Sequence, residues 1–183
     1  MISSQSPCMS MTTGMSKLLI FSIFNFVLVQ GSTTSQSIAT DYSQLEECPF
    51  PSNDQVKPCK CYGDSLYRIH LICELDSDVD EQLLKKISQL FNCSPIYLLD
   101  FNLNGHQWVT DFSAEHFGNL VLNKLHIRNA LSITGHLETD VFRSSAGSLT
   151  ELVMEPSSKP GRGSIKQKSF SGLQKLTMVK LGW

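Results

Sequence analysis

Four cysteines near the amino terminus have the most clearly defined chemistry in the chain. They are Cys48, Cys59, Cys61 and Cys73. A cluster of this kind either binds zinc or forms disulfides. Zinc sites place roughly two to four residues between paired cysteines, but only Lys60 lies between the second and third cysteine. We therefore expect two disulfides, for which three pairings exist. Cys93 stands apart, and we expect a buried free thiol there or a partner beyond this sequence.

Asp100 and His126 are the best candidates for acid–base chemistry. A neighbouring aspartate can orient a histidine as a general base, but the sequence places no nucleophile beside this pair. Gly-x-Ser-x-Gly, His-Glu-x-x-His and phosphate-loop motifs are all absent from the sequence. We expect a surface ion pair at this position, and we predict a non-enzymatic protein without catalytic residues, metal or cofactor.

A repeated phrase predicts the elements that position these residues. The pattern apolar-x-x-Leu-x-apolar occurs at 96–101, 122–127, 149–154 and 173–178, with starts 26, 27 and 24 residues apart. A phenylalanine precedes each later phrase, at positions 117, 142 and 170. Leucine-rich repeats have periods of roughly 20–29 residues. The pattern predicts an α/β leucine-rich repeat solenoid over residues 94–183, with one parallel strand per repeat, an irregular convex side and an incomplete last repeat.

The strand register predicts a binding face on the concave side, where the intervening residues point outward. Its residues should align laterally in three rows: Leu98, Lys124, Glu151 and Lys175; Asp100, His126, Val153 and Thr177; and Asn102, Arg128, Glu155 and Val179. Opposite charges alternate along the first and last rows. This alternation indicates either neutralisation between neighbouring strands or a recognition surface.

Residues 1–31 have the anatomy of a secretory signal peptide. An apolar run at 18–29 follows Lys17 and is too short for a bilayer, which needs about 20 apolar residues. We expect cleavage after Gly31, and Met15 is an alternative start. The mature protein is thus predicted to be secreted and extracellular, with no membrane segment.

The segment between the signal and the repeats divides into two parts. Residues 32–47 are polar and are predicted to be a disordered leader. Residues 48–93 carry the cysteine cluster and a helical pattern of apolar residues over 80–90. We expect this cysteine-rich part to cap the apolar edge of the first repeat.

The order of these motifs resembles secreted arthropod leucine-rich repeat proteins. The matching residues are Cys48-Pro, Cys59-Lys-Cys61, Leu71-Ile-Cys73, Asn104-Gly, Phe117-Gly-Asn, Leu125-His-Ile127 and Gly147-Ser-Leu149-Thr-Glu-Leu152. Many members are named after the non-catalytic subunit of Oplophorus-luciferin 2-monooxygenase. The resemblance covers residues 48–183 and implies an extracellular binding or scaffolding protein with disulfides Cys48–Cys61 and Cys59–Cys73. The asparagine that closes each strand turn in such repeats is present only as Asn104, with Ala130, Ser157 and Leu181 at the later positions.

A loop rich in proline and glycine carries four basic residues, Lys159, Arg162, Lys166 and Lys168. Such a loop either docks an acidic glycan or is simply solvated. Asn92-Cys-Ser94 is the only glycosylation sequon, and the cysteine within it weakens the prediction of its use.

The net charge of the chain limits the classes of partner that we expect. The net charge of −2 becomes −3 when Lys17 leaves with the signal, which argues against nucleic acid as a partner. We favour a secreted protein-binding or scaffolding module with an unidentified protein partner. The alternatives are a non-catalytic subunit of a secreted, luciferase-like oxygenase complex and an ectodomain fragment of a leucine-rich repeat receptor. Because the last phrase lacks a cap, we also expect a longer gene product or self-association.

Overall fold

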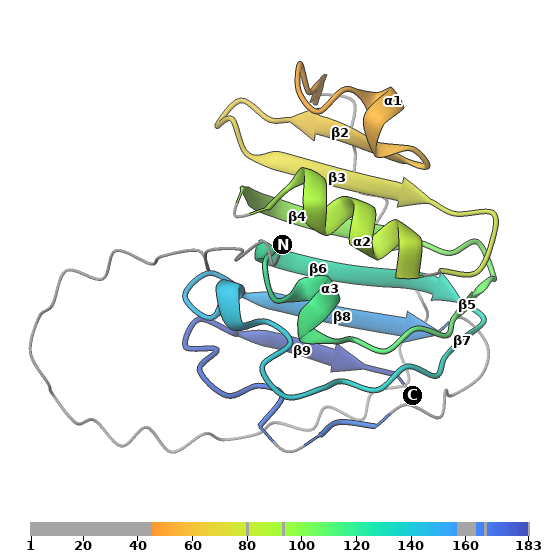
Figure 1. The fold of residues 1–183 in the computed structure, drawn as a ribbon, viewed down its shortest axis with the longest axis vertical. Coiled ribbons are helices and arrows are strands. Elements are labelled where there is room, and N and C mark those ends of the chain that lie inside the picture. The colour runs from red at the N-terminus through yellow and green to blue at the C-terminus, as the bar shows by residue number, and fades with distance from the viewer. Residues whose placement is uncertain (1–44, 80, 93, 157–163, 167, 183) are drawn as a thin grey trace, which may run out of the picture. The chain divides into compact units, whose positions relative to one another are not determined.

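A sheet of seven strands dominates the computed structural model, which describes residues 45–79, 81–92, 94–156, 164–166 and 168–182 (Figure 1). In spatial order the strands are β1 (Glu46–Glu47), β2 (Cys59–Gly63), β3 (Ile69–Glu74), β4 (Pro95–Asn102), β6 (Val121–Ala130), β8 (Glu151–Pro156) and β9 (Met178–Leu181). The pairs β1–β2 and β2–β3 are antiparallel, and every later pair is parallel. The predicted mixed α/β class with a mostly parallel sheet is confirmed.

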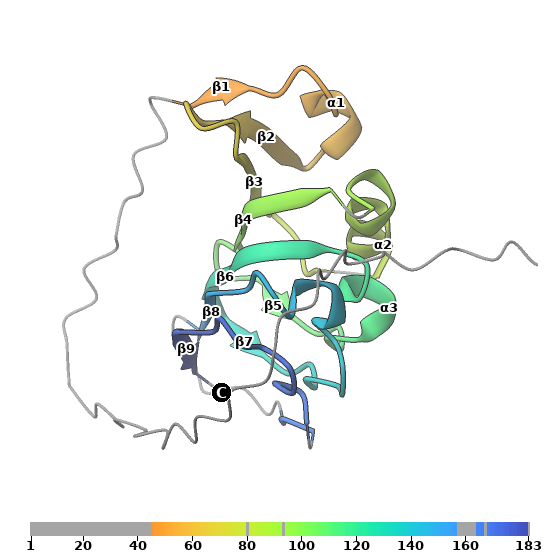
Figure 2. The ribbon, with the colours of Figure 1, turned by 90° about the vertical axis from the view of Figure 1, so that its left-hand side faces the viewer.

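Helices α2 (Glu81–Leu90) and α3 (Ala114–Phe117) lie on the same face of this sheet (Figure 2). Four further short elements complete the described fold: α1 (Asn53–Val56), the 3₁₀ helix η1 (Arg143–Ser145), and the parallel strands β5 (Gln107–Trp108) and β7 (Ser132–Ile133). The helix predicted over 80–90 is present over 81–90, and its Leu84 and Ile87 are buried. Its apolar residues recur at helical spacing because only one side of it meets the core.

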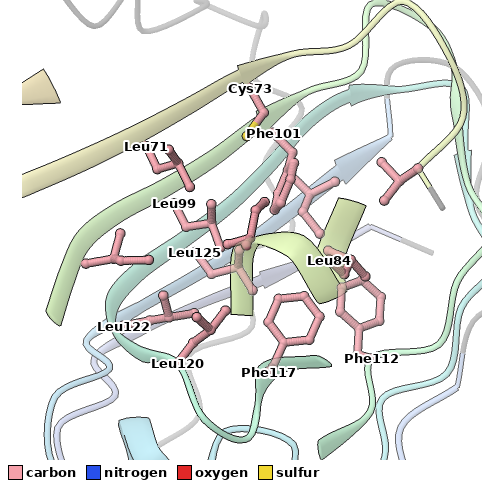
Figure 3. Packing of buried hydrophobic residues seen from close by; sticks show 14 of the residues in the cluster. Leu71, Cys73, Leu84, Leu99, Phe101, Phe112, Phe117, Leu120, Leu122 and Leu125 are labelled. Carbon is pink, nitrogen blue, oxygen red and sulfur yellow. The ribbon is translucent and has the colours of Figure 1, made fainter. Parts of the chain in front are cut away.

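The core lies between the sheet and the helices (Figure 3). Leu71, Leu99, Leu125 and Leu152 are partners in register across four adjacent strands and are fully buried. The connecting segments add aromatic rings, including Phe117, whose centroid is 5.9 Å from that of Phe142. The leucine of each of the first three phrases therefore points inward, as the repeat pattern predicts.

The register predicted for the fourth phrase is wrong. Lys175 was expected beside Glu151, but it lies exposed in a turn before β9, and Met178 is the residue that pairs with Glu151. Leu176 and Leu181 pack against the core. A phrase that starts at Leu176 lies 27 residues after Leu149 and carries valine in place of the expected leucine. Burial of these two leucines thus sets the register and moves Thr177 and Val179 out of their predicted rows.

One further difference lies near the amino terminus. Glu46 and Glu47, the last residues of the predicted leader, form β1 against Gly63 and Tyr62, so order begins before Cys48. The backbone of a polar segment can join a sheet edge without burying its side chains, which composition does not reveal. The predictions for residues 1–44 and for Cys93 lie outside the described residues.

A register shift interrupts the pairing of β6 with β8 after Ile127. Ala130 pairs with Pro156, so Arg128 and Asn129 together oppose the single residue Glu155. Asn129 has a φ of +54°, a conformation that asparagine tolerates better than most residues. The predicted alignment of Arg128 with Glu155 is therefore only approximate.

Candidate binding face of the sheet

The sheet face opposite α2 and α3 is here named the polar face. Its central side chains are Leu98, Asp100 and Asn102 from β4, Lys124, His126 and Arg128 from β6, and Glu151, Val153 and Glu155 from β8. The register places Leu98, Lys124 and Glu151 in one row. It places Asp100, His126 and Val153 in the next. Of the twelve residues in the three predicted rows, the structure brings these nine together; Lys175, Thr177 and Val179 are displaced with the fourth phrase.

Asp100 forms the most buried ion pair of the polar face. Its side chain is 1 % exposed, and its two oxygens accept hydrogen bonds from Arg128 Nε at 2.9 Å and Nη2 at 2.6 Å. The two residues lie diagonally across β4 and β6, within reach of a long side chain. A bidentate guanidinium compensates a buried carboxylate better than a single contact does.

Glu151 joins two residues of β6. Its Oε2 lies 2.7 Å from Lys124 Nζ, and its Oε1 lies 3.5 Å from His126 Nε2. Burial is the largest influence on His126 and lowers its pKa, whereas Asp100 and Glu151 act to raise it. The net effect keeps the imidazole neutral to lower pH than usual.

Asp100 and His126 are adjacent in register, as predicted, and the charge of Asp100 acts on the pKa of His126, but each residue also has another partner. Both oxygens of Asp100 are bonded to Arg128, and the contact nearest to an ion pair at His126 is with Glu151. The register places Asp100 next to His126, but the longer side chain of Arg128 reaches diagonally across the strands and forms the hydrogen bonds to Asp100.

Tyr97 lies near two basic side chains, Arg68 and Lys124, and these three residues are named the cationic corner of the polar face. The guanidinium carbon of Arg68 lies 4.0 Å from the centre of its ring, and Lys124 Nζ lies 5.6 Å from it. The ring of His70 packs against it at 5.3 Å. Cations over the face of an aromatic ring are attracted by its quadrupole. The repeat pattern does not predict this cluster, because its residues come from β3, from the turn before it, and from two other strands.

The third row of the polar face, which holds Asn102, Arg128 and Glu155, is also paired across strands. Asn102 donates to Glu74 at 2.7 Å and accepts from Asn129 at 2.9 Å. Glu155 forms an ion pair with Lys180 of β9. The predicted alternation of charge is thus present as contacts between neighbouring strands, but Met178 lies at the position expected for Lys175, and the basic residue that β9 contributes is Lys180, in register with Val153.

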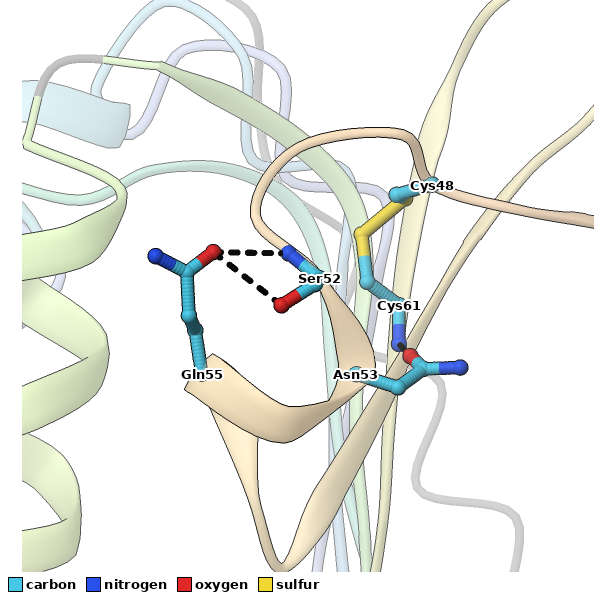
Figure 4. Close-up of a disulfide and its surroundings, with 5 residues drawn as sticks. All are labelled: Cys48, Ser52, Asn53, Gln55 and Cys61. Atoms are coloured by element: carbon cyan, nitrogen blue, oxygen red, sulfur yellow. Dashed lines mark hydrogen bonds between the residues drawn. A yellow bond between two sulfur atoms is a disulfide. The ribbon is translucent and has the colours of Figure 1, made fainter.

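The cysteine cluster forms the two disulfides Cys48–Cys61 and Cys59–Cys73, in the pairing that the resemblance implied. Zinc binding by these four sulfurs is thereby excluded. Figure 4 shows how Asn53 accepts a hydrogen bond from the Cys61 amide at 2.7 Å. Nearby, Gln55 accepts from the Ser52 amide at 2.9 Å, which closes the first turn of α1. No group of three potential metal ligands occurs in the described residues.

The basic loop is described only in part. Lys166 pairs with Glu138 at 2.9 Å, and Lys168 has a φ of +67°. Lys159 and Arg162 lie outside the described residues, so the glycan prediction stays a prediction.

Comparisons with known proteins identify no family for this chain. No helix in the described residues is long and apolar enough to cross a membrane. No protein-family model, curated protein or solved structure matches the chain.

Proposed function

We propose that this protein is a secreted, non-enzymatic module with leucine-rich repeat architecture that binds another protein through the polar face. The repeated phrase supports the architecture, because its leucines at 99, 125 and 152 stack in one buried column. Two disulfides are compatible with an oxidising, extracellular compartment.

The polar face is the observation that carries this proposal. Parallel sheets are usually covered by helices on both sides. Here the helices α2 and α3 share one side of the sheet (Figure 2). The other side presents charged residues, including Lys124, which is 31 % exposed, and Arg68, which is 41 % exposed. Such a surface combines a rigid backbone with partly desolvated charges, which favours specific recognition.

Pairing within the face also restricts which partners fit it. The charges of Lys124 and Glu151 neutralise each other, so a partner gains little from net charge alone. Specificity then depends on the order of charges along the strands. This favours a folded protein surface over a polyelectrolyte such as nucleic acid.

A charge-swap experiment tests the proposal. In the double variant Lys124→Glu with Glu151→Lys the ion pair is retained, but its polarity on the polar face is reversed. The matched control, Lys85→Glu with Glu115→Lys, reverses an exposed pair on α2 and α3. Tagged wild-type protein and both variants are exposed to the native secretion, and the bound chains are identified. We expect loss of the bound chain only with the first variant; equal recovery with both variants would contradict binding through this face.

The identity of the bound chain separates the alternative functions. An oxygenase that co-purifies in fixed stoichiometry would favour a non-catalytic subunit of an enzyme complex. A different extracellular protein would favour the scaffolding module.

A further inference from the structure

The turn between β2 and β3, residues 64–68, presents two large apolar side chains to solvent. Leu66 is 66 % exposed and Tyr67 is 95 % exposed, the highest value among the exposed large hydrophobic residues in the described part of the chain. Single exposed apolar residues are common on protein surfaces, but an adjacent aliphatic and aromatic pair at the end of a hairpin is less so.

A carboxylate fixes the conformation of this turn. Oδ1 of Asp64 accepts hydrogen bonds from the Leu66 amide at 2.9 Å and the Arg68 amide at 3.0 Å. Its Oδ2 contacts Arg68 Nε at 2.6 Å and His70 Nε2 at 3.1 Å. Burial of the carboxylate raises its pKa, but these hydrogen bonds together outweigh burial and hold the pKa well below its usual range. The turn is therefore held by a group that stays ionised at any physiological pH.

Tyr67 occupies an unfavourable backbone conformation. Its φ is +57°, in the left-handed region that bulky residues rarely adopt. Its amide donates to the Asp64 carbonyl at 2.8 Å, which closes the turn. Backbone strain of this kind is concentrated at functional sites, where it holds a side chain in a required position.

The turn is continuous with the cationic corner of the polar face. Arg68 follows Tyr67 directly and stacks on the ring of Tyr97, which also faces Lys124. Tyrosine and arginine are the residues most enriched, with tryptophan, among those that dominate protein interfaces. A preorganised turn also avoids the entropic cost of ordering a loop on binding.

A lipid surface fits this turn poorly. Glu46 and Glu47 lie exposed on β1, and Glu46 pairs with Gly63 immediately before the turn. These carboxylates would be repelled by anionic headgroups. Two apolar side chains also bury far less surface than one myristoyl chain, which by itself binds membranes only marginally.

We infer that Leu66 and Tyr67 are the apolar anchor of the proposed interface and insert into an apolar pocket on the protein partner. This inference rests on the proposed function of the polar face. The pocket must accept an aliphatic side chain and an aromatic ring, and it must supply an acceptor for the Tyr67 hydroxyl, since a buried phenol requires a hydrogen bond. Arg68 then lies at the rim, where its contacts add specificity.

A library of small folded peptide scaffolds with randomised surfaces, displayed on phage, provides the probe, because a folded scaffold can form a pocket and a short linear peptide cannot. Peptides are selected against the immobilised wild-type protein, and their affinities are then measured for variants. We expect most peptides to lose at least about 30-fold in affinity for Tyr67→Ala, the loss typical of an interface hot spot. Leu66→Ala should give a smaller loss, and Tyr67→Phe should separate the contribution of the hydroxyl. Val109→Ala, at a residue 52 % exposed in the segment after β5, is the control and should change nothing.

Folding is checked separately, by thermal unfolding and by mapping both disulfides in each variant. Tyr67→Asn provides a second substitution that tolerates the left-handed conformation, so that loss of binding cannot come from a distorted turn. A library that yields no binding peptide, or peptides unaffected at both Leu66 and Tyr67, overturns the inference.

The charge-swap variant of Lys124 and Glu151 separates this inference from the proposed function. Peptides sensitive to the swap but not to Tyr67→Ala would retain the polar face as a binding surface and remove the turn from it. Peptides sensitive to neither would contradict both. Binding to vesicles of phosphatidylcholine with phosphatidylserine, lost with Tyr67→Ala, would replace the protein partner by a membrane and overturn the inference.

Discussion

Arg128 places its guanidinium against both oxygens of Asp100, a carboxylate that is almost completely buried in the middle of the sheet. The pair joins β4 to β6 on the polar face, directly above the buried leucines of the opposite face. Removing one member leaves an uncompensated charge in a site that water reaches poorly.

The first prediction concerns this pair. Arg128→Met should lower the free energy of unfolding by about 3–5 kcal/mol, because the Asp100 charge loses its compensation. The double variant with Asp100→Leu should recover most of that loss, since no charge is then left unpaired. Urea unfolding of the three proteins measures the difference. A single variant within about 1 kcal/mol of wild type would show that water solvates the carboxylate.

A second prediction follows from the Cys59–Cys73 disulfide, which closes a short loop with a sequence separation of 14. Replacing both cysteines by alanine should lower the free energy of unfolding by about 2–4 kcal/mol, mainly through the gain in entropy of the unfolded chain. Hydrogen exchange should increase first in β2 and β3, and later in β8. Uniform acceleration across all strands would instead indicate that the sheet unfolds as one cooperative unit.

His126 provides a prediction about pH. Burial lowers its pKa in the folded protein below the unfolded value of about 6.5. The unfolded state therefore binds more protons once the pH falls below that value, and stability decreases as the pH falls through the window between the two pKa values. His126→Asn should show a shallower loss of stability between pH 7 and pH 5. Urea unfolding of both proteins at each pH tests this, and identical slopes would contradict it.

The strained turn predicts a stabilising substitution. Tyr67→Gly should raise the free energy of unfolding by up to about 1 kcal/mol, because glycine adopts the left-handed conformation freely but loses more entropy on folding. Tyr62→Gly, in β2 opposite His70, should instead be destabilising. Chemical denaturation of both variants provides the comparison. A loss at Tyr67 equal to that at Tyr62 would mean that the turn stores no strain.

The corrected register of β9 can be tested in the same way. Leu176→Ala should destabilise by about 1–3 kcal/mol because Leu176 packs against the core, whereas Lys175→Ala should stay within about 0.5 kcal/mol. The original register would assign Lys175 to the sheet and to an ion pair with Glu151. Comparable losses at both positions would favour that original assignment.

The strands with leucine at the fourth position of the phrase could be predicted from the sequence. Leu99, Leu125 and Leu152 set β4, β6 and β8, because burial on one face imposes a strict pattern. The sequence pattern predicts β9 three residues too early, because Val179 stands where the pattern expects leucine. The repeat pattern did not predict β3 for a related reason: Cys73 occupies the apolar position opposite Phe101.

The side-chain contacts of the polar face were less predictable. Register placed Asp100 beside His126, but the choice of Arg128 as its partner depends on side-chain length and on the irregularity after Ile127. The sequence around Asp64 does not differ from that of an ordinary polar hairpin. The turn is distinguished by four donor groups that converge on the Asp64 carboxylate, and their convergence is visible only in the structure.

Burial of the cysteines has a consequence for how the two bridges respond to reductants. Cys59 and Cys73 are at most 1 % exposed, whereas Cys48 is only partly buried. An attacking thiolate must reach a sulfur atom along the bond axis, so the Cys48–Cys61 bridge offers a direct point of entry. The Cys59–Cys73 bridge becomes accessible only when β2 separates from β3. Its reduction rate in the native protein therefore reports how often β2 and β3 separate, and it can be used to follow local opening at this end of the sheet.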